Sequence, residues 1–204
     1  MCASNIRFYT FDEAGVTYDQ IHEVIFKAHE RNRNKGLYYR TVDYTGEQIK
    51  NKIGNGATFV ALDDKTIVAT GSVGLHTGKS WYDKGLLVAH YCFDAVLPEY
   101  QRKGIMTAID KLRDEFSANN GVSVIRSGTA EKNYPQRQKF DRQGFIPVDY
   151  QRFSGNSFFS VLYAKWTDKD RKPSRFNCFL HYEYKKLITR LMFFISRVFR
   201  KVGL

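Results

Sequence analysis

A short segment of the chain, residues 95–106, combines the residue types that bind a phosphate group. An apolar stretch ends at Pro98, and a basic, glycine-containing turn then leads into a helical apolar pattern. The first N–H groups of a helix lack partners within it and lie at the positive end of its dipole, so they attract anions. Arg102 and Lys103 add charge, and Gly104 lets the backbone approach a ligand closely. The segment predicts a pyrophosphate-binding turn, although an ordinary basic turn before a helix has the same composition.

Three polar side chains interrupt the most apolar stretch of the chain, residues 86–96. Side chains alternate along a strand, so His90, Cys92 and Asp94 should share one face and the residues between them the other. Asp94 is a candidate general base, because burial would raise its pKa towards a useful value; a hydrogen-bonded structural acid is the alternative. His90 is a second candidate, with an ordinary pKa near neutrality. We interpret Cys92 as a small buried hydrophobic residue.

The remaining pattern predicts the elements that hold these residues in place. Apolar runs bounded by turn residues indicate seven strands, at residues 5–10, 57–62, 66–76, 86–96, 122–130, 145–153 and 158–166. Apolar residues at helical spacing indicate helices at residues 17–34, 45–53, 101–119 and 133–143. The strand–helix–strand order in the middle requires a parallel pair, whereas the hairpins require antiparallel pairs. We expect an α/β (α+β) fold with a mixed, mostly antiparallel sheet and helices on both faces.

The basic turn resembles the acetyl-CoA signature of the GCN5-related N-acetyltransferases (the GNAT superfamily), written Gln/Arg-x-x-Gly-x-Gly/Ala. Gln101 and Gly104 fill the first two fixed places. Met106 stands at the third place, where the family prefers a small residue. Its backbone N–H is still available, provided that the side chain points away from the phosphates.

A downstream segment resembles a second motif of the same family, an Asn followed seven positions later by an aromatic residue and then by Gly-Phe. Here these places hold Asn133, Phe140 and the pair Gly144-Phe145. The order of elements over residues 6–167 is also similar to that of the family. The resemblance implies a GNAT-like sheet of about seven strands in which a central parallel pair splays apart.

The resemblance implies acetyl-CoA as co-substrate, without a metal, and assigns residues to hold it. Backbone groups of Ala95 and Val96 would pair with the pantetheine arm as an added strand does. Asn133 would contact the same arm while capping its helix. The basic turn and first helical residues would hold the pyrophosphate: Gln101, Arg102, Lys103, Gly104, Ile105 and Met106.

Phe140 departs from the family pattern, because many members have a tyrosine there that protonates the departing thiolate. Phenylalanine has no proton to give, so the reaction needs another donor, such as Tyr134 or water. A thiol has a pKa of about 8.5, so its thiolate leaves with modest help. The departure also motivates another interpretation, in which the chain is a non-catalytic acyl-CoA-binding module.

The family resemblance places the acceptor in a cleft between the first two helices and the last hairpin. The candidates for lining it are His29, Glu30, Tyr38, Tyr39, Tyr44 and Tyr150. Such groups suit a sugar or an amino-acid-like acceptor, and plain packing of surface tyrosines is equally consistent with them. We expect an acetyl-CoA-dependent N-acetyltransferase that acts on a primary amine of a small molecule, for example an amino sugar, by direct attack on the thioester.

The cysteines and the hydropathy of the chain indicate its compartment. Cys2, Cys92 and Cys178 are odd in number, far apart and without metal-ligand spacing, so we expect reduced thiols and no zinc site. The N-terminus does not resemble a signal peptide, and no run of about 18 apolar residues is present. These observations predict a cytoplasmic protein.

The C-terminal segment carries most of the net charge of +11. Residues 171–204 hold nine Lys or Arg and one acid, Glu183, against 23 bases and 20 acids before them, so the body is nearly balanced and no nucleic-acid-binding domain is expected. The polar run 168–173 suggests a boundary between a domain at 1–168 and an extension at 169–204.

An amphipathic helix is predicted at residues 181–201 of this extension. Its apolar residues at helical spacing are Tyr184, Leu187, Ile188, Leu191, Met192, Ile195, Val198 and Phe199. Such a helix suits the surface of an anionic membrane, at the inner face, or packing on its own domain or on a second subunit of a homodimer. A membrane-docking protein with a vestigial cofactor groove is the corresponding alternative function.

Overall fold

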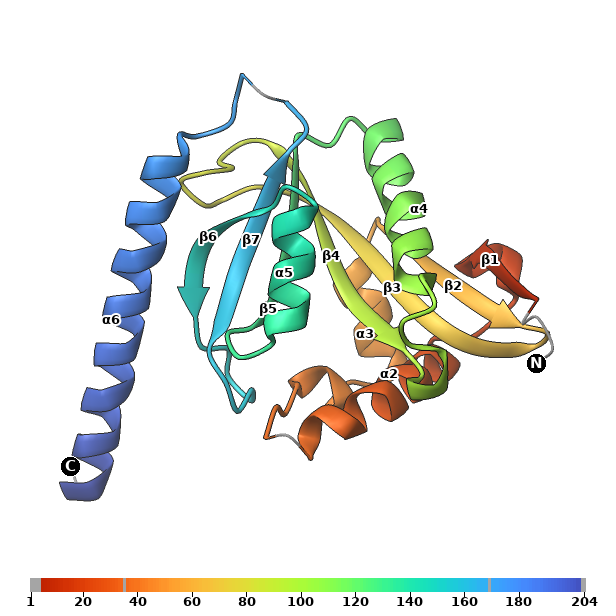
Figure 1. Ribbon diagram of the computed structural model, residues 1–204, viewed down its shortest axis with the longest axis horizontal. Helices are drawn as coiled ribbons and strands as arrows, with labels where there is room; N and C mark the ends of the chain where they lie inside the picture. Colours follow the sequence, from red (N-terminus) through yellow and green to blue (C-terminus); the bar gives the residue numbers. More distant parts are fainter. Residues whose placement is uncertain (1–4, 35, 169, 203–204) are drawn as a thin grey trace.

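The computed structural model describes residues 5–34, 36–168 and 170–202 (Figure 1). Its strands are β1 (Ile6–Thr10), β2 (Ala57–Asp63), β3 (Thr66–Thr77), β4 (Leu87–Val96), β5 (Val124–Ala130), β6 (Ile146–Gln151) and β7 (Ser160–Trp166). Its α-helices are α1 (Phe11–Ala14), α2 (Tyr18–Arg33), α3 (Gly46–Ile53), α4 (Ile105–Asn119), α5 (Tyr134–Arg142) and α6 (Arg175–Val202). Two 3₁₀ turns, η1 (Arg40–Asp43) and η2 (Pro98–Tyr100), complete the elements of these residues.

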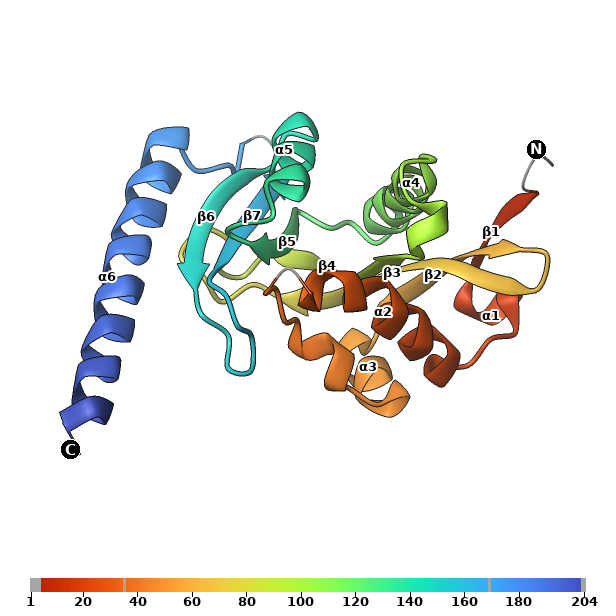
Figure 2. The same cartoon turned by 60° about the horizontal axis from the view of Figure 1, so that its bottom comes forward.

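The strands form one seven-stranded sheet in the order β1-β2-β3-β4-β5-β7-β6. Only the β4–β5 pair is parallel among the strand pairs of the described residues. Helices α4 and α5 cover one face, α2 and α3 the other, and α6 stands beside β6 at the edge (Figures 1 and 2). This architecture confirms the predicted mixed α/β fold with helices on both faces and an additional C-terminal helix.

Capping boxes fix where the N-terminal helices begin. The side chains of Thr17 and Thr45 each accept a hydrogen bond from the backbone N–H three residues on. In return, the side-chain oxygens of Gln20 and Gln48 accept from the backbone N–H of the capping threonine. Each box satisfies backbone groups that a helix end leaves without partners. Each box therefore defines the residue at which its helix starts, and so which side chains form the apolar face that packs on the sheet.

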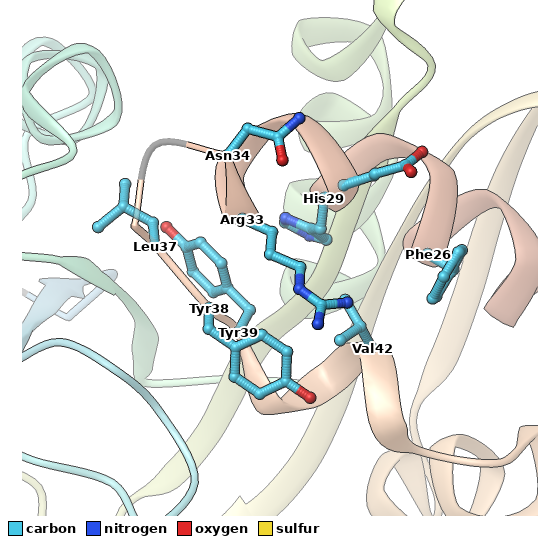
Figure 3. A pocket seen from close by; sticks show the side chains of 9 residues that line it. Phe26, His29, Arg33, Asn34, Leu37, Tyr38, Tyr39 and Val42 are labelled. Atoms are coloured by element: carbon cyan, nitrogen blue, oxygen red, sulfur yellow. The ribbon is translucent and has the colours of Figure 1, made fainter.

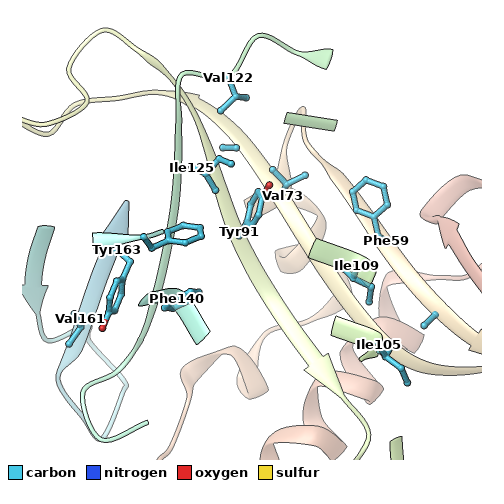
Figure 4. Packing of buried hydrophobic residues seen from close by; sticks show 14 of the residues in the cluster. Phe59, Val73, Tyr91, Ile105, Ile109, Val122, Ile125, Phe140, Val161 and Tyr163 are labelled. Carbon is cyan, nitrogen blue, oxygen red and sulfur yellow. The ribbon is translucent and has the colours of Figure 1, made fainter. Parts of the chain in front are cut away.

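The core has two main layers, one on each side of the sheet. Ile105 and Ile109 of α4 pack with Phe140 of α5 on the first side (Figure 4). Ile21 and Ile25 of α2 fill the second side. These side chains are at most 4% exposed, so apolar burial holds α2, α4 and α5 against the sheet.

The helix predicted to begin at residue 101 begins instead at Ile105, so that boundary was wrong. Arg102 and Gly104 have φ angles of 64° and 79°, in the left-handed region that a right-handed helix excludes. The chain therefore makes a turn between η2 and α4 before the helix starts.

A β-bulge in β4 overturns the simple alternation predicted for that strand. Thr70 pairs with Ala95 and Ser72 with Cys92, so two residues of β4, Phe93 and Asp94, lie opposite Gly71 alone. Phe93 has a φ of 56° and packs with Cys92 on the α2 side. Asp94 lies on the α4 side, so the prediction that it shares a face with Cys92 was wrong.

Candidate functional site

A seam opens in the middle of the sheet where β4 and β5 part. The two strands pair only from Val88 with Val124 to His90 with Arg126. Beyond that point β4 pairs with β3 alone, while β5 continues to pair with β7. The splayed parallel pair expected from the sequence is therefore present, and the edge of β4 that includes the bulge faces the opening.

The turn before α4 presents a row of unpartnered N–H groups beside this seam. Within the described residues, the backbone N–H groups from Arg102 to Thr107 donate to no protein acceptor. Left-handed φ angles at Arg102 and Gly104 curl the backbone so that such groups can converge on an anion. The side chain of Gln101 donates from Nε2 to the carbonyl of Val96 at 3.1 Å, which ties the turn to the end of β4. This donor set fits phosphate oxygens.

The bulge is held by a buried charge cluster. Arg113 of α4 is 1% exposed and donates to both carboxylate oxygens of Asp94, to Asp110 and, at 3.2 Å, to the carbonyl of Ser72. Asp110 also pairs with Lys139 of α5 at 2.6 Å. Burial opposes the charge of Arg113, but the two carboxylates outweigh it and raise the pKa of Arg113 above its usual value. Since the carboxylate of Asp94 already binds this guanidinium, it is a poor candidate for removing a proton from an amine.

A cavity of about 210 Å³ lies between α2 and η1 (Figure 3). It is lined by the four acceptor-binding candidates His29, Glu30, Tyr38 and Tyr39, together with Phe26, Arg33, Asn34, Leu37 and Val42. The last five residues were not predicted from the sequence to line the acceptor site. A signal was present in the spacing of Phe26, Glu30 and Arg33, which puts them on one face of a helix.

Two further tyrosines predicted to line the acceptor site lie elsewhere. Tyr44 packs edge-on against Phe93, with ring centroids 6.4 Å apart. Tyr150 is fully buried, and its hydroxyl donates to Glu131 at 2.7 Å. Neither residue lines this cavity.

His29 connects the cavity to the β4 bulge. Its ring packs on Tyr39 with centroids 4.8 Å apart, and Nδ1 lies 3.0 Å from the side-chain nitrogen of Asn32. Burial lowers the pKa of His29, while the backbone and carboxylate of nearby Asp94 oppose that effect. His29 is therefore neutral at pH 7, the state in which an imidazole can accept a proton.

Asn133 joins the cavity to the start of α5. Its side-chain oxygen accepts from the backbone N–H of Gln136 at 3.4 Å, which confirms the predicted helix cap. Its side-chain nitrogen donates to the hydroxyl of Tyr39 at 3.4 Å. Tyr134, the next residue, is 64% exposed at the first position of α5.

Phe140 is a core residue on the inner side of α5. It is 4% exposed and packs on Phe145 and Tyr163, with ring centroids 5.3 and 5.0 Å away. Its ring also lines the small space between α4, α5 and the seam that contains Asp94 and Arg113. Its position thus anchors α5 beside the seam.

The other two polar groups of β4 are both uncharged at neutral pH. Burial, with the nearby charge of Arg126, lowers the pKa of His90 to about 4. Burial, with the charge of Asp94, raises the pKa of Cys92 to about 12. His90 lies in the part of β4 that is still paired with β5, so it does not line the open seam.

Within residues 5–34, 36–168 and 170–202, no group of three or more His, Cys, Asp or Glu is arranged to hold a metal ion.

Comparison with known proteins gives a consistent set of matches. The model of the acetyltransferase (GNAT) family matches residues 18–145. The S-(2-succino)cysteine N-acetyltransferase of Bacillus subtilis (strain 168) is 25% identical over 130 residues, which are 63% of this chain and 78% of that protein. Similar structures include a GNAT family acetyltransferase from Elizabethkingia anophelis with acetyl-CoA bound (14% identity, TM-score 0.55, 80% of this chain and 99% of that chain). An acetyltransferase from Streptococcus agalactiae 2603 has 16% identity and a TM-score of 0.60 over 80% of this chain and 99% of that one.

Proposed function

The chain belongs to the acetyltransferase (GNAT) family, whose members transfer the acetyl group of acetyl-CoA, and we propose that it acetylates the primary amine of a small molecule. The observation that carries the proposal is the row of free N–H groups from Arg102 to Thr107 at the mouth of the β4–β5 seam. A phosphate site and an open strand edge lie side by side there. The acceptor cavity lies across the bulge of the same strand.

The proposed cofactor contacts follow from this layout. N–H groups of the turn, including those of Lys103, Gly104 and Ile105, hold the pyrophosphate, and the side chains of Arg102 and Lys103 add positive charge. Backbone groups of Ala95 and Val96 pair with the pantetheine arm, in the manner of an added strand. The thioester carbonyl then lies next to the bulge, where strand N–H groups polarise it.

We propose His29 as the group that removes the proton from the amine. It is neutral at pH 7, lines the cavity and lies beside the backbone of Asp94 at the bulge. Asp94 then holds the bulge through Arg113 instead of acting as the base. His90 is a weaker candidate, because it belongs to the paired part of β4 and its pKa is about 4.

In the reaction, the neutral amine attacks the thioester carbonyl, the new C–N bond forms and the C–S bond breaks. The amine proton goes to His29, and the thiolate leaves with a proton from water or from Tyr134, which is exposed at the start of α5. Phe140 supplies no proton but keeps α5 in place. Positioning of the two substrates supplies much of the rate enhancement.

The cavity favours an acceptor that carries its own charges. Arg33 and Glu30 both line the cavity, together with the aromatic rings of Tyr38 and Tyr39. Such a lining suits a zwitterionic amino acid with a further carboxylate, and a relative is named for acetylating S-(2-succino)cysteine. We therefore propose an amino-acid-like acceptor ahead of the amino sugar predicted from the sequence.

The proposal is tested by calorimetric titration of the chain with acetyl-CoA, comparing Gly104→Glu with Gly85→Glu. The two glycines have φ angles of 79° and 77°, and a Cβ on either meets no atom within 4 Å, so both changes add equal strain and charge. Gly104→Glu puts a carboxylate beside the pyrophosphate and should weaken binding at least about a hundredfold, whereas Gly85→Glu should bind as the wild type does.

Turnover on a panel of amino acids and amino sugars completes the test. Acetylation of an amine with release of CoA supports the enzyme. Tight acetyl-CoA binding without turnover would point to the non-catalytic acyl-CoA-binding module, and no binding at all to the membrane-docking alternative. A cytoplasmic location and a homodimer remain predictions.

A further inference from the structure

Helix α6 contacts the rest of the molecule through one face only. Cys178 and Tyr182 are buried, at 1% and 6% exposed. Further along the helix, the ring of Phe193 packs edge-on against Phe159 at 5.3 Å. The helix lies beside β6 along this line and leaves its opposite side turned away from the sheet (Figure 1).

Polar contacts fix the rotation of α6 about its own axis. Thr189 donates to the carbonyl of Tyr150 in β6 at 3.1 Å. Arg190 pairs with Glu131 at 2.6 Å and donates to the hydroxyl of Tyr150 at 3.2 Å. Burial favours the neutral Glu131, but Tyr150 and Arg190 hold the pKa of its carboxyl below the usual value, so the pair is charged at neutral pH. The helix therefore cannot turn its outer side inward without breaking these contacts.

That outer side is almost entirely apolar. Its large side chains are each between 38% and 67% exposed: Phe176, Phe179, Leu180, Tyr184, Leu187, Ile188, Leu191, Met192, Phe194, Ile195, Val198 and Phe199. The set includes every residue of the apolar stripe predicted from the sequence, so this stripe does not pack on its own domain. An exposed apolar surface of this extent on a soluble domain marks an interaction site.

Basic residues accompany the apolar side, and the C-terminal segment itself holds little negative charge to balance them. Residues 171–204 contain a single acid, Glu183, and it pairs with Lys186 at 3.6 Å. Lys185, whose amino group lies 4.0 Å from Asp149 of β6, and Arg197 are further cations of the helix. Long basic side chains can lay their stems along apolar surface while the charge stays in water. Trp81, 44% exposed, packs at a tilt against His181 with ring centroids 5.0 Å apart and extends the surface with a residue type common at membrane interfaces.

We propose that the outer face of α6 lies in the surface of an anionic lipid bilayer and holds the enzyme there. Charge complementarity favours an anionic membrane over a second copy of the chain as the partner of this face. Two copies of the helix packed face to face would bring two sets of cations together with one acid each, whereas anionic headgroups neutralise them. No helix within the described residues is long and apolar enough to cross a membrane, so the helix lies in the plane of the surface.

The test is sedimentation of the full chain with vesicles of equal parts phosphatidylglycerol and phosphatidylcholine, and with vesicles of phosphatidylcholine alone. The wild type should bind the anionic vesicles and release them at high salt. The triple variant Leu187→Ser, Leu191→Ser, Phe194→Ser should bind at least about a hundredfold more weakly, because it removes the most deeply inserted apolar groups. Phe153→Ser, at an exposed aromatic outside α6, is the matched control and should bind as the wild type does.

A charge reversal separates the electrostatic part of the binding. Arg197→Glu should weaken binding about tenfold or more, whereas Lys65→Glu in the β2–β3 turn should not. Calorimetric titration with acetyl-CoA checks that each variant is folded. The proposal is overturned if the wild type ignores anionic vesicles, or if the triple variant binds them equally well. A concentration-dependent dimer that the triple variant abolishes, without vesicle binding, would identify a second copy as the occupant instead.

Discussion

At the scale of residues, surroundings matter more than residue type. His29 and His90 both have a lowered pKa, and burial is the main cause for each. Only His29 borders a cavity of a size that admits a small acceptor. Asp94 also shows the effect of surroundings, because both oxygens of its carboxylate accept hydrogen bonds from the buried guanidinium of Arg113 and are not free to act as a base. This difference in position is why we propose His29 for the proton transfer that the sequence left open between His90 and Asp94.

The role that we propose for His29 predicts a specific pH dependence. The folded protein holds the pKa of His29 below 6.5, so the base is neutral at pH 7 and is lost as the pH falls through that lowered pKa. In the wild type, kcat/KM should therefore show an acid limb with an apparent pKa below 6.5. His29→Gln should lower kcat about a hundredfold at pH 7 and remove this limb, without weakening acetyl-CoA binding.

His76→Gln is the matched control for that experiment. The pKa of His76 is also lowered by burial, but this histidine belongs to the far end of β3, away from the cavity. It should leave both the rate and the pH profile unchanged. An acid limb that persists in His29→Gln would assign the base to another group.

At the scale of elements, Arg113 links three of them. The guanidinium joins α4 to the bulge of β4 through Asp94 and to the carbonyl of Ser72 in β3. Asp110 extends the connection to α5 through Lys139. A buried charge of this kind is stable only while its partners are present.

Arg113→Met should therefore destabilise the protein by about 3 kcal/mol, because it leaves two carboxylates near each other without their shared cation. Urea unfolding followed by circular dichroism measures the change in the free energy of unfolding. Lys111→Met, on the exposed side of the same helix, should change it by less than about 0.5 kcal/mol. Equal free energies of unfolding for the two variants would mean that the charge cluster shapes the bulge without stabilising the fold.

At the scale of the whole molecule, α6 is packed as part of the fold and not only appended to it. Its buried residues Cys178 and Tyr182 cover core that also includes residues of β5, β6 and β7. Because the two parts share buried surface, the division into a domain at 1–168 and an extension at 169–204 depends on how much α6 contributes to the free energy of unfolding.

Removing residues 171–204 should lower the free energy of unfolding by about 3–5 kcal/mol, because the covered apolar surface becomes exposed to water. A thermal unfolding scan measures this as a lower Tm. The triple serine variant of the outer face should keep the wild-type Tm, because its altered residues touch no core. An unchanged Tm after truncation would establish 169–204 as an independent extension.

Much of the fold was predictable because its signals are local. Capping threonines and apolar spacing placed α2 and α3 to within a residue or two, and glycines marked the ends of several elements. The bulge was not predictable, because Phe93 adopts a positive φ without being a glycine. The face of α6 that contacts the sheet was also not predictable from local sequence. Its contacts are with residues far away in sequence, such as Glu131, and do not involve the most apolar stripe of the helix.

The seam in the sheet has a mechanical consequence. The strips β1–β4 and β5–β7 are joined along three residue pairs of β4 and β5, so they form two stiff panels on a short hinge. A ligand bound in the seam would contact both strips, so we expect it to restrict their motion relative to each other. Because β6 is the edge strand of the second strip, this restriction should extend to the strand beside which α6 lies.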